Sequence, residues 1–249
     1  MSAGAGLGAA VGLTRRWLVE PLLSALFPER CAACQEFVDR PSHGPLCSAC
    51  WAALPRHRAP LCACGAPLGA AGPCGRCRRG RPTLARGLSL GPYEGALRTL
   101  VLELKYRSRQ RVARHLAELL ARDPACGALA EPEALLVPVP LHPRRRRERG
   151  FNQAELLARA LAARLARECE PAALVRRRET RPQAGLTAAA RRRNVAGAFA
   201  VRRQARVAGR LVVLVDDVVT TGATVQACAR ALRAAGAREV RLVSAARVV

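Results

Sequence analysis

The residues best suited to chemistry are two adjacent carboxylates followed by a run of small hydroxyl residues. Asp216 and Asp217 come directly after the apolar run 211–215. Behind them stand Thr220, Thr221, Gly222, Ala223 and Thr224. Backbone N–H groups in such a turn, and at the start of the helix expected after it, can hold an anion. Because carboxylates repel phosphate, Asp216 and Asp217 suit hydroxyls or a magnesium-bound polyol, so the stretch as a whole fits a ribose 5-phosphate.

A second chemistry is indicated by cysteines, eight of which lie between residues 31 and 77. They form two quartets, Cys31, Cys34, Cys47 and Cys50, then Cys62, Cys64, Cys74 and Cys77. Thiolates spaced in this way can grip one tetrahedral zinc ion per quartet, as in a zinc ribbon. The Cys62-x-Cys64 pair is one residue shorter than the others, so the sequence predicts one or two structural zinc ions. Paired knuckles without an export signal favour metal over a disulfide framework.

Strands alternating with helices must position these residues. Apolar runs predict strands at 85–90, 135–139, 197–201, 211–215 and 240–249. Periodic apolar positions predict helices at 96–104, 112–121, 152–167 and 223–235. This order predicts an α/β fold, a mostly parallel sheet with flanking helices. Residues 15–27 predict a short amphipathic helix, whereas the arginine-rich residues 176–193 show no usable periodicity.

Charge gives a weaker indication of a partner. The chain has 249 residues and a formal net charge of +24, which attracts polyanions such as single-stranded DNA. Lys105 is the sole lysine, however, and an arginine excess of this kind also arises from the codon usage of a GC-rich genome. Aromatic residues make up only 3% of the chain, which disfavours strong base stacking.

Hydropathy argues against insertion into a membrane. No run of about 18 uncharged apolar residues occurs, so no stable membrane insertion is expected. The apolar stretch 5–13 is short, and its positive charges follow it rather than precede it, unlike a secretory signal. The expected location is therefore cytoplasmic.

The stretch 211–224 resembles the phosphoribosyl pyrophosphate (PRPP) motif of type I phosphoribosyltransferases. Other segments occur in the order typical of one branch, the ComF family: the cysteine knuckles, Tyr93-Glu94-Gly95, Pro138-Val139-Pro140-Leu141, Arg149-Gly150-Phe151-Asn152-Gln153, Arg193-Asn194-Val195 and Gly197-Ala198-Phe199. This resemblance covers nearly the whole chain. It implies an N-terminal amphipathic segment (1–30), a double zinc ribbon (31–80) and a phosphoribosyltransferase-like domain (84–249).

The resemblance also implies roles for residues. Asp216 and Asp217 would hold the ribose hydroxyls as the catalytic candidates, and residues 220–224 would hold the 5-phosphate of PRPP, bound with Mg²⁺. Pro140 and His142 would lie where related enzymes cradle pyrophosphate, with the arginines of 144–149 to neutralise it. Residues 176–193 resemble the flap that covers PRPP in glutamine amidophosphoribosyltransferases, and their arginines would bind the phosphates of PRPP, a nucleic acid, or only water.

The acceptor is not indicated by the sequence, and the resemblance links the chain to competence and DNA uptake. The expected function is therefore a PRPP-binding, phosphoribosyltransferase-like protein with an unknown acceptor. The alternative is an accessory protein that binds single-stranded DNA and keeps the PRPP-type site only for sensing or docking phosphate.

Overall fold

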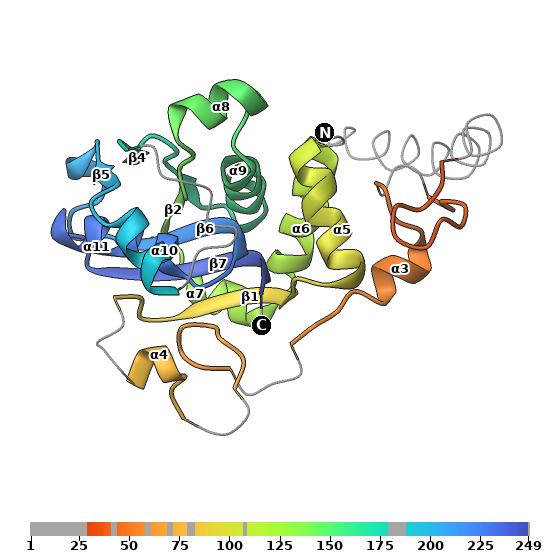
Figure 1. The fold of residues 1–249 in the computed structure, drawn as a ribbon, viewed down its shortest axis with the longest axis horizontal. Helices are drawn as coiled ribbons and strands as arrows, with labels where there is room; N and C mark the ends of the chain where they lie inside the picture. Colours follow the sequence, from red (N-terminus) through yellow and green to blue (C-terminus); the bar gives the residue numbers. More distant parts are fainter. Residues whose placement is uncertain are drawn as a thin grey trace, which may run out of the picture.

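The computed structural model describes residues 29–40, 44–57, 61–68, 72–78, 83–106, 109–178 and 188–248. Its centre is a five-stranded parallel sheet in the order β1-β7-β6-β2-β3 (Figure 1). The strands are β1 (Gly87–Pro92), β2 (Leu135–Pro138), β3 (Glu168–Cys169), β6 (Leu211–Val219) and β7 (Glu239–Arg247). The parallel α/β sheet expected from the alternating pattern is thus confirmed.

Helices cover both faces of this sheet. They are α5 (Gly95–Tyr106), α6 (Arg109–Ala121), α7 (Pro124–Leu129), α9 (Gln153–Leu165) and α11 (Ala223–Ala234), whereas α8 (Pro143–Arg149), which follows β2, buries none of its residues. In the first half of β6, Leu211 and Val213 pack with the apolar side chains of α5, α6 and α9. Val212 and Leu214 pack on the other face with those of α11. A strand buried on both faces in this way reads as a continuous apolar run, which is why β6 was clear in the sequence.

A small antiparallel pair stands apart from the main sheet. It joins β4 (Leu174–Arg176) to β5 (Phe199–Val201), and α10 (Ala188–Val195) precedes β5. Most of α10 falls in the segment 176–193, for which the sequence shows no usable periodicity and predicted no element. Of that helix, Val195 is buried in the core, and Arg178 donates to the carbonyls of Asn194 and Ala196 at its end. Residues 179–187 lie outside the described residues.

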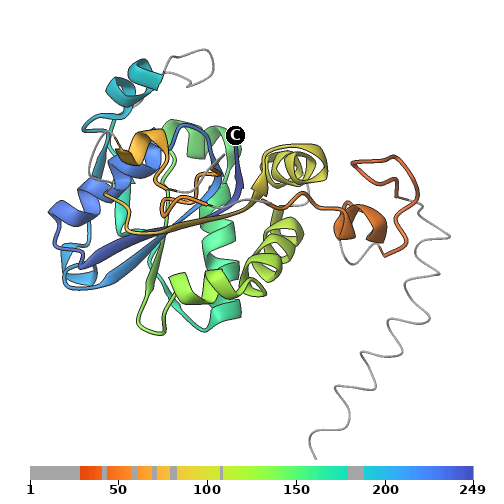
Figure 2. The ribbon, with the colours of Figure 1, turned by 90° about the horizontal axis from the view of Figure 1, so that it is seen from below.

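In the described residues of the cysteine segments, regular structure is limited to α3 (Ser48–Ala52), α4 (Gly75–Arg78) and two isolated β-bridges. The cysteine segments lie against different parts of the α/β domain. Residues 29–57, red to orange, extend beyond α5 and α6, whereas residues 61–78 lie along β1 (Figures 1 and 2).

Two expectations concern the N-terminus and the membrane. The amphipathic helix expected at 15–27 lies outside the described residues. Among the helices that are described, none has the length and apolar character needed to cross a bilayer.

Candidate functional site

A cavity of about 380 Å³ opens at the carboxyl ends of the parallel strands. The chain moves outward from β2 to β3, then returns to β6 on the other side of β2 and continues to β7. The strand order therefore reverses between β2 and β6. Open α/β sheets bind ligands in the crevice at such a reversal. The cavity is lined there by Val139, Pro140 and Leu141 after β2 and by Asp216 and Asp217 in β6.

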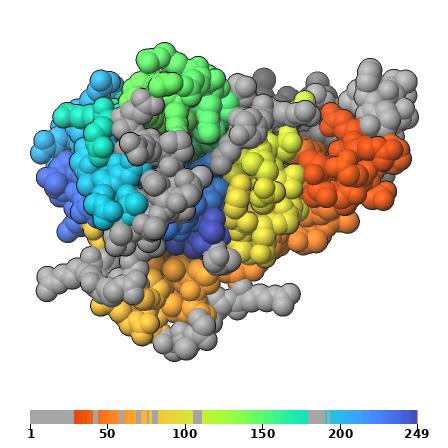
Figure 3. All heavy atoms as spheres, viewed as in Figure 1, coloured from red at the N-terminus to blue at the C-terminus, as the bar shows by residue number. Residues whose placement is uncertain are grey.

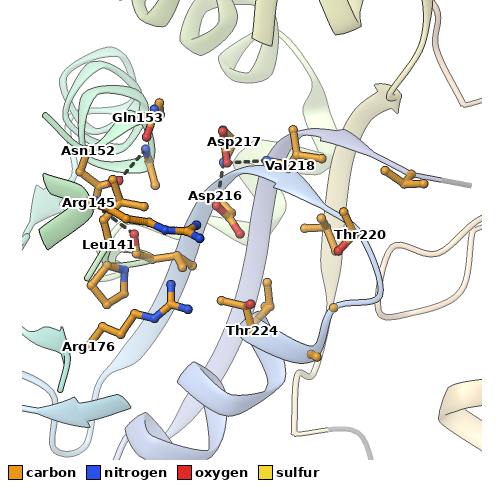
Figure 4. Close-up of a pocket in the computed structure, with 18 of the residues that line it drawn as sticks. Leu141, Arg145, Asn152, Gln153, Arg176, Asp216, Asp217, Val218, Thr220 and Thr224 are labelled. Carbon is orange, nitrogen blue, oxygen red and sulfur yellow. Dashed lines mark hydrogen bonds between the residues drawn. The ribbon is translucent and has the colours of Figure 1, made fainter. Parts of the chain in front are cut away.

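The two acids lie within β6 rather than after it. The strand predicted at 211–215 continues to Val219, because the ladder to β7 extends as far as Val219 opposite Arg247. Adjacent strand residues point to opposite sides. Figure 4 shows Asp217 on the side of α9 and Asp216 on the side of Thr224 and α11. Asp216 is buried and Asp217 half-buried, so the pair faces a partly desolvated space from both sides of the strand.

The turn after β6 leads directly into α11. Gly222 has φ of 70°, a left-handed conformation that glycine adopts without strain, and it is the N-cap residue of α11. Glycine has no side chain with which to cap the helix. Thr220, Gly222, Ala223 and Thr224 line the cavity. Thr221 does not, and its hydroxyl accepts a 3.4 Å hydrogen bond from the Ala223 N–H.

Backbone donors are available in this turn. Within the described part of the chain, no acceptor is found for the N–H groups of Thr221 or Gly222. Unsatisfied N–H groups at the start of a twelve-residue helix favour an anion. The turn is therefore suited to a phosphate group.

The opposite wall is held in place by Asn152. Its Nδ2 donates to the Val139 carbonyl at 3.0 Å, and its Oδ1 accepts from the Ala154 N–H at the start of α9. Pro140 lines the cavity. His142 does not line it; this residue is the N-cap of α8, where its Nδ1 accepts from the Arg144 N–H at 3.4 Å.

Three arginines bring positive charge to this wall. Arg145 and Arg149 come from α8, and Arg176 comes from β4. Figure 4 shows Arg145 and Arg176 extending toward the space in front of Asp216. Burial lowers the pKa of Arg176, and the charge of Arg145 lowers it further, while Asp216 acts in the opposite direction. Arg176 belongs to the segment 176–193 that resembles the flap over PRPP, whereas the three-residue strand β4 that positions it was not predicted.

The cavity thus has two unlike ends. The arginines surround the β2 end, whereas Tyr93, Val218 and Val248 line the end toward β1 and β7. Arginine guanidinium groups bind phosphate oxygens strongly and in fixed geometry. The arrangement can hold a diphosphate at the arginine end, a sugar over the two acids and a phosphate in the turn.

The first cysteine cluster consists of Cys31, Cys34, Cys47 and Cys50, whose sulfur atoms lie within 4.8 Å of one another. The Sγ atoms of Cys34 and Cys47 are 3.7 Å apart. Tetrahedral zinc with Zn–S bonds of about 2.3 Å requires sulfur separations of about 3.8 Å. Burial raises the pKa of Cys31, but backbone N–H groups donate to its sulfur and bring the pKa down to about 6, which favours the thiolate that a metal needs.

The second cysteine cluster, Cys62, Cys64, Cys74 and Cys77, has the same geometry. Its sulfur atoms also lie within 4.8 Å of one another, with 3.7 Å between the Sγ atoms of Cys64 and Cys74. The shortened Cys62-x-Cys64 spacing therefore does not prevent a four-sulfur site. None of these cysteines is in a disulfide. The residues present fit two structural zinc sites.

Comparison with known proteins agrees with both parts of the chain. Residues 22–78 match the double zinc ribbon domain, and residues 151–248 match the phosphoribosyl transferase domain. The chain is 40% identical over 207 residues to the DNA utilization protein YhgH of Salmonella typhi, covering 81% of this chain and 89% of that protein. It is 36% identical over 205 residues to YhgH of Escherichia coli K12, covering 80% and 89%. Similarity to competence protein F of Haemophilus influenzae is 34% over 228 residues, covering 89% and 98%.

Proposed function

Since the chain belongs to the ComF family, we propose that its cavity binds PRPP with Mg²⁺ and transfers the phosphoribosyl group to an acceptor. One observation carries this proposal. Two acids, a turn at a helix start and three arginines surround one cavity. The acids suit the sugar hydroxyls of a single ligand, the turn suits its 5-phosphate, and the arginines suit its diphosphate. The link to competence and DNA uptake, and a cytoplasmic location, belong to the same proposal.

The protein's part in the reaction is to position and to stabilise charge. Asp216 and Asp217 hold the ribose hydroxyls, and the turn 220–224 fixes the 5-phosphate. The bond between ribose C1 and the pyrophosphate oxygen breaks, the electron pair leaves with pyrophosphate, and Arg145, Arg149 and Arg176 bind that leaving group. Carboxylates beside the ring stabilise the positive charge that develops at C1. Asp216 and Asp217 are the carboxylates that would hold a bound Mg²⁺, which would supply further charge neutralisation.

The acceptor then approaches from the other end of the cavity. Its lone pair must enter opposite the departing pyrophosphate, and the wall opposite the arginines contains Tyr93, Val218 and Val248. This end offers one aromatic ring and few polar groups.

Titration calorimetry with PRPP and Mg²⁺ tests the binding step. The native protein is expected to give saturable heat. Asp217→Asn is expected to weaken binding about 10- to 100-fold, since a hydrogen bond to a charged group contributes about 1.5–3 kcal/mol. Asp123→Asn is the matched control, because Asp123 only caps α7 through a side-chain oxygen that Asn also has. No saturable heat from the native protein contradicts the proposal.

A second candidate, binding of single-stranded DNA, is favoured by exposed arginines beside the cavity. Arg144, Arg146 and Arg147 are exposed on α8, as are Arg177 and Arg178 after β4. DNA held there should bind with an affinity that falls steeply with salt, and Asp216→Ala should leave that affinity unchanged. Binding of PRPP should be lost in the same variant, so the two candidates are separable.

A further inference from the structure

We propose that Arg247 couples the second cysteine cluster to the ligand cavity, so that metal in this cluster strengthens ligand binding and bound ligand slows metal loss. The coupling rests on the proposed function for the identity of the ligand. Arg247 is then a positioning residue, and the second cluster supports ligand binding as well as its own local structure.

The side chain of Arg247 makes the contact with the cluster. Arg247 is only 5% exposed, and its Nη2 donates to the carbonyl of Cys64 at 2.9 Å. Its Nε donates to the Ser89 hydroxyl at 3.4 Å, and that hydroxyl is 2.7 Å from the hydroxyl of Ser244. A buried guanidinium needs such acceptors, because an unpaired charge is costly away from water. A shift of the Cys64 carbonyl would therefore move the Arg247 side chain at the end of β7.

The backbone of Arg247 makes the contact with the cavity. Its carbonyl accepts from the Tyr93 N–H at 2.7 Å, and on its other side it lies opposite Val219 in the ladder. The next residue, Val248, donates to the Val219 carbonyl at 2.9 Å. Tyr93, Val219 and Val248 all line the cavity, and Val219 directly precedes the phosphate turn. One residue thus joins a cysteine ligand to the cavity wall.

A close backbone contact keeps the cluster fixed on the sheet. The Gly87 N–H in β1 donates to the Ala63 carbonyl at 2.7 Å. A Cβ atom on Gly87 would lie 2.6 Å from the Cys64 carbonyl oxygen, and one on Gly65 would lie 2.6 Å from the Gly87 carbonyl oxygen. Only glycine fits on each side of this contact. Figure 3 shows the orange atoms of the segment gathered below the dark-blue atoms of the C-terminal strand.

Metal in the second cluster holds this arrangement together. The Cys64 side chain is a ligand while its carbonyl is the acceptor for Arg247, so the metal fixes the acceptor through a single residue. Loss of metal frees the turn, weakens the hold on Arg247 and loosens the ladder beside Val219. Binding linkage is reciprocal, so a ligand that favours the ordered wall also favours metal retention.

The first cluster provides an internal control. In the described residues, no hydrogen bond joins it to a residue that lines the cavity. Its contact with the domain includes the Trp51 ring, 5.3 Å from the ring of His115 in α6. Metal in this cluster should be indifferent to the ligand.

The experiment measures zinc release from the full chain into an excess of a zinc-selective chromophoric chelator, with and without PRPP and Mg²⁺. We expect two phases in the native protein, one of them slowed at least threefold by PRPP and the other unchanged. Arg247→Lys keeps the charge but not the forked donors, so it should abolish the slowing and weaken PRPP binding about tenfold. Arg241→Lys is the matched control: Arg241 is an equally buried arginine of β7, and its contacts are with Glu131, Glu239 and the α7 carbonyls.

The outcomes separate the two proposals. Two results overturn the coupling alone. In one, the protein binds PRPP but its zinc release is equally fast with and without PRPP; in the other, PRPP still slows zinc release in Arg247→Lys. Absence of PRPP binding by the zinc-loaded native protein overturns the proposed function and the coupling together. If Arg247→Lys fails to fold, Ser89→Ala removes the acceptor of Nε and should reduce the slowing while the protein keeps its zinc; unchanged slowing in that variant overturns the coupling.

Discussion

The two cysteine clusters have the same ligands but contact the rest of the chain in different ways. Cys31 and Cys47 belong to the same apolar core as Leu97 and Leu100 of α5. The second cluster instead lies along β1, where backbone hydrogen bonds and the buried Arg247 make the contact. The difference gives two like clusters separate places in the fold: the first is part of the apolar core, and the second is the one that we propose supports the wall of the ligand cavity.

Removal of one metal ligand from each cluster should give the largest contrast. Cys47→Ser is expected to lower the free energy of unfolding by several kcal/mol, because zinc contributes about 10–16 kcal/mol in small modules and this cluster is part of the core. Cys74→Ser removes a half-buried ligand of the second cluster, whose cysteines belong to neither apolar core, and is expected to cost less stability but to weaken PRPP binding. Denaturant unfolding measures the stability of each variant, and calorimetry measures its PRPP binding. Equal losses of stability and of PRPP binding in the two variants would contradict separate roles for the clusters.

Core packing beside the first cluster gives the next largest effect. Leu46 is fully buried in the core, so Leu46→Ala should lower the free energy of unfolding by about 2–5 kcal/mol. Leu61, half-buried beside the second cluster, is the matched position, and Leu61→Ala should cost clearly less. Urea titrations report both values. A larger loss at Leu61 would show that the second cluster, not the first, anchors the core.

The tight backbone contact of the second cluster is tested with glycine. Gly87→Ala should lower the free energy of unfolding by about 1–3 kcal/mol, as overpacking does, and should speed zinc release from the second cluster only. Gly127→Ala in α7 meets no atom within 4 Å and should be neutral or stabilise by up to about 1 kcal/mol. A Gly87→Ala protein with native stability and zinc release would show that the contact is looser than described.

The residue pattern itself predicted the sheet, the two acids and the turn, whereas the arginines of 144–149 and 176–193 were assigned to phosphate through the family resemblance. β6 and the turn 220–224 are contiguous, and their apolar run, paired acids and glycine form a local pattern. Arg247 reaches the second cluster across 183 positions of sequence. Such contacts depend on tertiary packing, for which a single sequence contains no local signal. The same holds for the extension of β6 to Val219, which pairing with β7 produces.

The smallest expected effect is the pH dependence of stability that His57, between the two clusters, contributes. Burial lowers the pKa of His57, the charge of Arg247 lowers it further, and Glu94 acts in the opposite direction. The folded state therefore binds fewer protons than the unfolded state, and stability should fall as pH drops through the unfolded value of about 6.5. His57→Gln should flatten this dependence by less than about 1 kcal/mol between pH 7.5 and 6. Identical pH profiles of unfolding for native protein and variant would contradict this assignment.

The central claim is that one cavity binds a phosphoribosyl group between the acids of β6 and the turn before α11. A crystal structure of the native protein with PRPP and Mg²⁺ tests it most directly. The account predicts the 5-phosphate at the N–H groups of residues 221–224, the ribose hydroxyls at Asp216 and Asp217, and the diphosphate facing Arg145 and Arg176. A ligand bound elsewhere, or a cavity that stays empty at saturating PRPP, would contradict it.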